Sequence, residues 1–418
     1  MRRTLTAIAV LFGLPLSVAA CLWDRDTPAD EARGMPEVVA VLTGRFERNP
    51  PLFYEMRLAR VSAHLRDLPQ DLAGYDDAGV ACDRLGRGEE AVEWMEKKRA
   101  QLETLDASLP AVKEHWYRLH ANLGTFLVHG WARQGADRSK ISEVKAARDE
   151  IVRALEINPN AHFGREKSQL LALTWIVDPP KLGDSQVLPN LLGWQAHDFN
   201  GTNTAPQMAD DAVRGLAGLI VLGNAWESVD IFNALNQALQ RDSQGFARNE
   251  EGGRNTLAYL AWLRCCELVD AGRGSMLPDA PKGQALKAIL PRPDFLKSVG
   301  ILEDSYLQLR TEADAWQAAR AEFMTSRLNA GHHPDTEPGF WEGYVERPAP
   351  LLPTQSVPDA YNALSEWRRW WSTVALIGVP LVSIALIFGL PAVRRAKTRR
   401  LKAAGMNRIG AESGDEPR

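Results

Sequence analysis

The sequence predicts an all-α protein with one membrane-spanning helix near its C-terminus. Between Cys21 and about His333, apolar residues recur at spacings of three and four, while alternating Val/Ile/Thr runs are scarce. The helical patterns come in pairs, and short turns that contain glycine separate the two members of a pair. Residues Trp370–Val393 hold no charge and are long enough to cross a hydrocarbon layer of ~30 Å.

The first residues have the three-part layout of a secretory signal. Two arginines precede the apolar run Leu5–Leu16, and the small residues Ser17–Ala20 follow it. Residues Val18–Cys21 resemble a bacterial lipobox, in which Cys21 is lipidated and becomes the first residue of the mature chain. Cleavage after Ala20 without lipidation, and retention as an uncleaved anchor, are the alternatives. We therefore expect residues 1–21 to be a signal, with Cys21 as the lipidation candidate.

Basic residues fix the orientation expected for the span. Arg368 and Arg369 precede it, whereas six basic residues follow within 394–402. The positive-inside rule therefore places the tail 394–418 in the cytoplasm. The signal independently sends the body outward. The prediction is a single-pass protein of the cytoplasmic (inner) membrane, in contact with lipid through one span, with an extracytoplasmic body.

The formal net charge of −4 averages regions of opposite sign. The tail 394–418 carries eight basic and three acidic residues, and Arg2 and Arg3 add two more positive charges. The part between these ends therefore sums to about −11. Because an acidic body repels polyphosphate, we expect no nucleic acid partner.

The clearest helix pair carries small and aromatic residues at characteristic places. Its motif residues are, in order, the aromatic Tyr75, the small Gly79, the turn residue Gly86, the contact alanine Ala91, and Met95. This segment resembles the tetratricopeptide repeat family, whose unit of about 34 residues is a helix–turn–helix. Gly79 and Ala91 have almost no side chain, so the two helices can approach closely. Lys98 departs from the family's second alanine, which suggests that this helix leaves the stack early or faces solvent there.

A second unit follows the same resemblance. It opens around Gly124, and its closing helix matches the family at Ala147, Ile151, Ala154 and the terminal Pro159. The stretch 130–142 is longer than the family's turn, so an inserted loop or an extended helix is needed there. The resemblance is clearest over 72–165 and weaker over 210–330. We expect a helical-hairpin solenoid over 22–333, followed by a proline-rich linker over 334–369 that acts as an extended spacer.

Motifs that would indicate catalysis or a bound cofactor are missing from the sequence. There is no phosphate-binding glycine loop, zinc-protease motif or nucleophile elbow, and no CxxC spacing. Cys82, Cys265 and Cys266 are expected to be small buried residues, although a disulfide from Cys82 to one of the pair stays open. Asp76, Asp77 and Glu166 are interpreted as charges near helix starts, and His332 and His333 as a solvated turn. We expect no enzyme, no cofactor and no metal.

The function that this reading favours is a scaffold that binds a protein or peptide of the envelope on its concave face. Because repeats of this kind serve many processes, the resemblance implies protein binding by analogy. An α-helical envelope hydrolase, with carboxylates on the loop 178–207, is the alternative. A third possibility is a subunit whose main contact is the span itself. The oligomeric state stays open.

Overall fold

The computed structural model describes residues 22–27, 37–159, 164–183, 187–194, 206–241, 253–293, 299–350 and 352. Over these residues the secondary structure consists of helices and turns without any strand, which confirms the all-α prediction. All of these residues belong to one compact unit. None of the helices in these ranges combines the length and the apolar character that a membrane span needs. The predicted signal with Cys21, the linker beyond 352, the span 370–393 and the tail all lie outside the described ranges.

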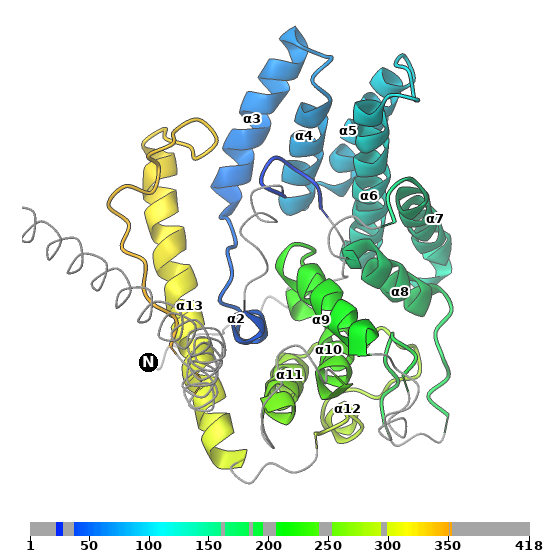
Figure 1. The fold of residues 1–418 in the computed structure, drawn as a ribbon, viewed down its shortest axis with the longest axis vertical. Helices are drawn as coiled ribbons and strands as arrows, with labels where there is room; N and C mark the ends of the chain where they lie inside the picture. The colour runs from blue at the N-terminus through cyan, green and yellow to red at the C-terminus, as the bar shows by residue number, and fades with distance from the viewer. Residues whose placement is uncertain are drawn as a thin grey trace, which may run out of the picture. The chain divides into compact units, whose positions relative to one another are not determined.

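The helices are labelled in Figure 1. In chain order they are α2 (Val38–Thr43), α3 (Pro51–Asp67), α4 (Leu72–Arg84), α5 (Gly88–Leu102), α6 (Pro110–Arg133), α7 (Ile141–Ile157), α8 (Arg165–Val177), α9 (Pro206–Val221), α10 (Val229–Arg241), α11 (Gly253–Asp270), α12 (Gln284–Ala288) and α13 (Val299–Asn329). Two short 3₁₀ turns, η1 (Arg138–Lys140) and η4 (Ala225–Glu227), precede α7 and α10.

Local sequence signals explain where several helices begin and end. Helices α3 and α6 start with Pro51 and Pro110, at the position where the missing N–H of proline is no loss. The side chain of Asp71 accepts a hydrogen bond from the Gly74 N–H and so caps α4. Gly86 takes a φ of +78° in the turn between α4 and α5, a conformation that glycine adopts without strain.

Consecutive helices from α3 to α11 each pack on the next, and α4 also contacts α6. This succession follows the chain through the blue, cyan and green helices of Figure 1. Helices α2 and α13 connect the first and last helices of this succession. Helix α2 contacts α9, α11 and α13, and α13 also contacts α3. Helices that lie almost 250 residues apart in the chain are therefore neighbours in the fold, as Figure 1 shows for α13 and α3.

Two glycines mark the closest helix contacts in the first part of the succession. A Cβ added at Gly124 on α6 would lie 2.8 Å from the carbonyl oxygen of Ala147 on α7. A Cβ added at Gly79 on α4 would lie 2.9 Å from both Met95 on α5 and Phe126 on α6. These distances are shorter than ordinary contacts, so the helices approach each other where a side chain is missing.

Several residues behave differently from the sequence-based interpretation. Lys98 is fully buried and paired with a carboxylate, so the prediction that it faces solvent is wrong. The long stretch after Gly130 belongs partly to α6, which continues to Arg133, so the extended helix is the expected alternative that the structure shows. The expected spacer starts too early, because Phe340 packs in one apolar cluster with Phe53 of α3 and Met324 of α13.

The histidine pair that precedes Pro334 is also part of this packed region. His333 is buried, and its Nε2 lies 3.1 Å from the carbonyl oxygen of Phe53 on α3. His332 is exposed and lies 2.7 Å from Glu337. The interpretation as a solvated turn is therefore wrong for His333, because the chain after α13 folds back onto α3.

Candidate segment-binding site

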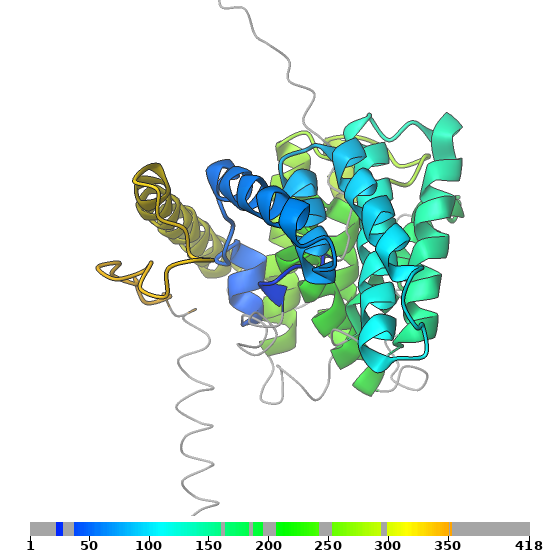
Figure 2. The same ribbon diagram turned by 90° about the horizontal axis from the view of Figure 1, so that it is seen from above.

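Residues 22–27, here called the N-terminal segment, contact one surface formed by α3, α4 and α6. The dark blue trace of this segment lies among these helices in Figure 1, and it is also visible from above in Figure 2. Leu22 and Trp23 are both buried. After Trp23 the chain turns, and the Thr27 N–H donates a hydrogen bond to the carbonyl oxygen of Asp24.

Asn122 on α6 holds the main chain of this segment at two points. Its Oδ1 accepts a hydrogen bond from the Trp23 N–H at 2.7 Å, and its Nδ2 donates to the Trp23 carbonyl oxygen at 3.0 Å. Both bonds are buried, and the two residues are 99 positions apart in the chain. One side-chain amide therefore satisfies both main-chain groups of a single residue, much as a neighbouring strand would.

The side chain of Trp23 fills a small pocket of its own. It packs with Tyr117 and Ala121 of α6 and with Ala154 of α7. The indole N–H donates to the Tyr117 hydroxyl at 3.2 Å, and the Arg118 guanidinium lies 4.3 Å from the ring centre. The Tyr117 hydroxyl in turn donates to Glu166 Oε1 at 2.7 Å. The pocket thus offers an apolar floor, a polar partner for the indole and a cation over the ring.

Arg25 pairs with a buried carboxylate of α4. Its main-chain N–H donates to Asp77 at 2.9 Å, and its Nε donates to the other oxygen of Asp77 at 2.8 Å. Burial raises the pKa of Asp77, and the hydrogen bond and charge of Arg25 act in the opposite direction. Asp77 therefore needs a cation, and the N-terminal segment supplies it.

The segment's own carboxylates contact a buried arginine of α3. Arg57 is fully buried and lies 3.1 Å from Asp24, 2.9 Å from Asp26 and 2.6 Å from Asp335. Burial and the neighbouring charge of Asp24 raise the pKa of Asp26 to about 7. For Asp335 burial acts in the same upward direction, but the hydrogen bond and charge of Arg57 and the hydrogen bond of Arg60 outweigh it and lower the pKa to about 2. Asp335 is thus the firmly ionised partner of Arg57, and Asp26 the weaker one.

A buried ion pair between Lys98 and Asp76 holds the side chain of Asn122 in place. Lys98 of α5 donates to both oxygens of Asp76 on α4 at 2.7 Å, and Asn122 Nδ2 also donates to Asp76 at 3.1 Å. Burial lowers the pKa of Lys98 and raises that of Asp76 to about 6, while each partner's charge acts against this effect. Asp76 orients the amide of Asn122 so that its oxygen faces the Trp23 N–H.

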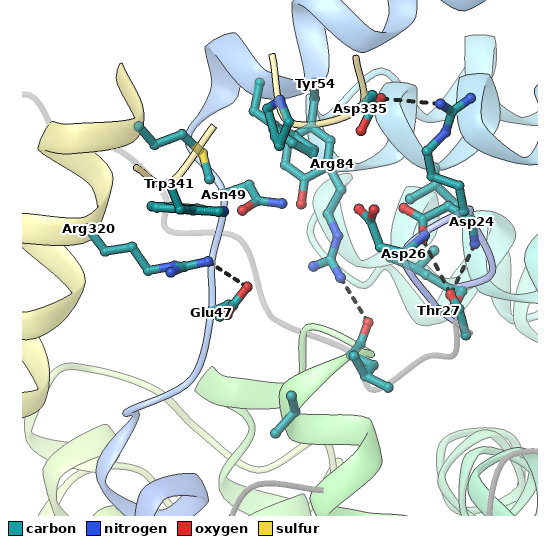
Figure 3. A pocket seen from close by; sticks show the side chains of 18 residues that line it. Asp24, Asp26, Thr27, Glu47, Asn49, Tyr54, Arg84, Arg320, Asp335 and Trp341 are labelled. Atoms are coloured by element: carbon teal, nitrogen blue, oxygen red, sulfur yellow. Dashed lines mark hydrogen bonds and ion pairs between the residues drawn. The ribbon is translucent and has the colours of Figure 1, made fainter. Parts of the chain in front are cut away.

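A hollow of about 430 Å³ borders the N-terminal segment. Figure 3 shows the guanidinium of Arg84 in its middle, between Asp26 and the pair formed by Glu47 and Arg320. Arg84 donates to the Leu222 carbonyl oxygen at 2.8 Å, and Arg320 lies 2.7 Å from Glu47. The walls are therefore polar and carry both signs of charge.

The repeat residues expected from the sequence are distributed along α4 to α7. Ala91, Met95, Ala147, Ile151 and Ala154 are fully buried. Tyr75 is buried and donates from its hydroxyl to the Pro69 carbonyl oxygen at 3.0 Å, whereas Pro159 is exposed two residues after α7. Ala154 alone of these ten positions, which also include Gly79, Gly86 and Gly124, belongs to the cluster around Trp23.

Sequence reasoning missed most of the residues that hold the N-terminal segment. Asp76 and Asp77 are buried within α4 rather than placed at its start. Glu166 does lie in the first turn of α8, as predicted, but its burial beside Tyr117 was not foreseen. Asn122 and Tyr117 had no role in the repeat pattern. A buried polar residue on an otherwise apolar helix face is the one signal that could have identified Asn122, because such residues need partners.

The described residues bear little on the alternative of a hydrolase. Among the acidic residues of the loop 178–207, only Asp178 falls in a described range, where it lies exposed and 3.3 Å from Arg148. Within the described ranges no group of three or more His, Cys, Asp or Glu is arranged to hold a metal ion. Cys82, Cys265 and Cys266 are free thiols in this structure.

Comparisons with models of protein families, with curated proteins and with solved structures find no match for this chain.

Proposed function

We propose that this chain is a membrane-anchored scaffold of the extracytoplasmic space, built from tetratricopeptide-like helix pairs, that binds segments of other proteins. The fold supports the repeat assignment through the pairs α4–α5 and α6–α7, whose helices meet at Gly79 and Gly124. The signal-like N-terminus and the apolar run 370–393 support the anchoring.

The observation that carries this proposal is the contact between Asn122 and the main chain of Trp23. Helix packing uses side chains, whereas Asn122 binds the peptide groups of a chain that is not helical at that point. Main-chain hydrogen bonds combined with side-chain pockets are a recurring way to recognise a peptide. A surface with this chemistry suits a protein that recruits partners, and it needs no catalytic group.

Recovery of partners from native membranes tests this function. The full chain and its Asn122→Ala variant are crosslinked in cells, purified and compared by mass spectrometry. Asn236→Ala is the matched control, since Asn236 is another buried amide that donates to a main-chain oxygen, that of Pro291, at 2.7 Å. We expect partners that are lost with Asn122→Ala and retained with Asn236→Ala. Identical sets from all three chains would contradict the proposal.

The anchoring is tested separately from the binding. Protease added outside intact spheroplasts is expected to digest the body and to spare a tail tag after Arg418. Metabolic labelling with a fatty acid is expected to mark the wild-type chain and not the Cys21→Ala variant. A protected body would contradict the topology, and equal labelling of both chains would contradict lipidation at Cys21.

A further inference from the structure

We infer that the surface of α3, α4 and α6 recognises a partner segment with a tryptophan that is followed, two residues later, by an arginine within an acidic turn. The inference rests on the proposed function and names the partner's chemistry. In this structure the chain's own residues 22–27, with the sequence Leu-Trp-Asp-Arg-Asp-Thr, occupy the site. Residues 22–27 therefore show the chemistry expected of the partner segment, and they compete with that segment for the site.

Charge complementarity determines which partner fits. Asp77 is buried and receives its cation from Arg25, and Arg57 is buried and receives carboxylates from Asp24 and Asp26. Removing one member of a buried ion pair leaves an uncompensated charge, which is strongly unfavourable. A segment that replaces residues 22–27 must therefore bring one cation for Asp77. Arg57 keeps Asp335 as its ionised partner, and a carboxylate of the segment adds a second contact to it.

The tryptophan determines where the segment is anchored. Its pocket combines Tyr117, Ala121 and Ala154 with the cation of Arg118 above the ring. An indole satisfies all three features at once, because it is large, apolar and carries one N–H donor. Buried tryptophan and arginine are the residues that most often dominate the binding energy of an interface.

The arrangement of the segment is that of an exchangeable ligand. The hollow of about 430 Å³ borders Leu22, Asp24, Arg25, Asp26 and Thr27 along one side. Figure 3 shows Asp24 and Asp26 among the residues that line this hollow. The side chain of Arg25 is 38% exposed, so the ion pair with Asp77 is accessible to a competing group.

Binding of a labelled peptide to the full chain in detergent tests the inference. The probe is the sequence of residues 22–27, acetylated and amidated, and fluorescence anisotropy follows its binding. In the wild-type chain the tethered copy competes at an effective concentration that is about millimolar for a short linker. Trp23→Ala weakens this copy, so we expect this variant to bind the probe at least about tenfold more tightly than wild type.

Changes to the probe and to the site give the specificity. A probe with alanine in place of its tryptophan or its arginine is expected to bind Trp23→Ala at least about tenfold more weakly. Adding Asn122→Ala to Trp23→Ala is expected to abolish binding, whereas adding Asn236→Ala is expected to leave it unchanged. Circular dichroism checks that each variant keeps its helix content.

A second variant decides the question if Trp23→Ala does not fold. Arg25→Ala removes a side chain that is 38% exposed, so it leaves no cavity in the core. It also leaves Asp77 without its cation, which weakens the docking of the tethered segment. We expect it to bind the probe more tightly than wild type. Equal binding by wild type and by every folded variant overturns the inference. If that occurs while Asn122-dependent partners are still recovered from membranes, only the partner's chemistry is wrong; if those partners are also missing, the proposed function fails too.

Discussion

Two regions of this fold bury carboxylates in different ways. In the region of α3, α4 and α6 each buried carboxylate of α4 or of the chain after α13 contacts a cation: Asp76 with Lys98 at 2.7 Å, Asp77 with Arg25 at 2.8 Å, Asp83 with Arg133 at 2.7 Å, and Asp335 with Arg57 at 2.6 Å. On α10, Asp230 is equally buried but receives its hydrogen bonds from two neutral donors, Ser275 Oγ at 2.6 Å and the Met276 N–H at 2.7 Å.

The difference separates a region that depends on ion pairs from one that depends on apolar packing. The core around α8 to α11 is a large apolar cluster, in which Asp230 ties down the loop after α11. The region of α3, α4 and α6 has smaller apolar clusters, and ion pairs connect them. Ion pairs are directional and need their partners, so this region depends on the N-terminal segment in a way that the α8–α11 core does not.

The largest effect is expected from Lys98→Ala. This change leaves Asp76 buried without its cation, which costs about 3–5 kcal/mol of the free energy of unfolding. Urea unfolding of the detergent-solubilised chain, followed by circular dichroism, measures it. The double variant Asp76→Leu with Lys98→Met removes both charges and should recover most of the loss. A loss below about 1 kcal/mol in the single variant would show that this pair behaves like a surface pair.

The next effect is a pH dependence at Asp230. Burial raises its pKa to about 6, above the ordinary value of 3.8, so the folded state binds the proton more tightly than the unfolded state. This group therefore lowers stability as the pH rises from about 4 to about 6, by about 3 kcal/mol at 1.36 kcal/mol per pKa unit. The stability of wild type minus that of Asp230→Asn should fall over this range. A constant difference between pH 4 and pH 7 would contradict the assignment.

Asp83, in the region of α3, α4 and α6, is expected to give a pH dependence of stability opposite to that of Asp230. Burial acts to raise its pKa, but His129 and Arg133 outweigh this and lower the pKa to about 2. Its contribution is therefore present above pH 4 and is lost as the pH falls toward 2. The stability of wild type minus that of Asp83→Asn should fall on acidification, in contrast to the result for Asp230→Asn.

A smaller effect is expected from closing the helix contact at Gly124. Gly124→Ala puts a methyl group 2.8 Å from the main-chain oxygen of Ala147, which cannot rotate away, and this costs about 1–3 kcal/mol. Gly215→Ala in α9 meets the Oγ of Ser168, which can rotate, so its loss should be smaller. Gly130→Ala meets nothing within 4 Å and should stabilise α6 by about 0.5–1 kcal/mol. The order of the three melting temperatures checks the prediction, and a reversed order refutes it.

The smallest effect is expected at a solvent-exposed pair. Arg99 and Glu96 are 2.8 Å apart on α5, and both side chains are accessible to water. Arg99→Ala should therefore change the free energy of unfolding by less than about 1 kcal/mol, and the change should vanish at high salt. A loss as large as that of Lys98→Ala would remove the distinction between exposed and buried pairs in this region.

Local patterns predicted most of the helices and failed on the site for a physical reason. The turn glycine Gly86 predicted the break between α4 and α5, and the paired pattern over 72–165 predicted α4 to α7. These signals act over one or two helical turns. The contact between Arg57 and Asp335 joins residues 278 positions apart, and the one between Trp23 and Asn122 joins residues 99 apart. Residue spacing within one helix cannot predict contacts between residues so far apart in the chain.

Lys98 shows how the same limit led to a wrong prediction. A lysine at a position where the repeat pattern has alanine favours an exposed helix face. Its burial follows only once Asp76 on the neighbouring helix is known to face it. Asp76 was itself interpreted as a helix-start charge. The buried pair could therefore not be predicted from either residue alone.

If Cys21 is lipidated as proposed, the burial of Leu22 limits how far the body can move from that lipid. Leu22 packs among Val61, Tyr75 and Val80, and one residue of chain spans at most about 3.6 Å. With Cys21 acylated, docking of residues 22–27 would hold this face of the protein flush against the headgroups, and release of the segment would add slack for the body to lift. Exchange of the segment for a partner would then also change the height of the scaffold above the bilayer.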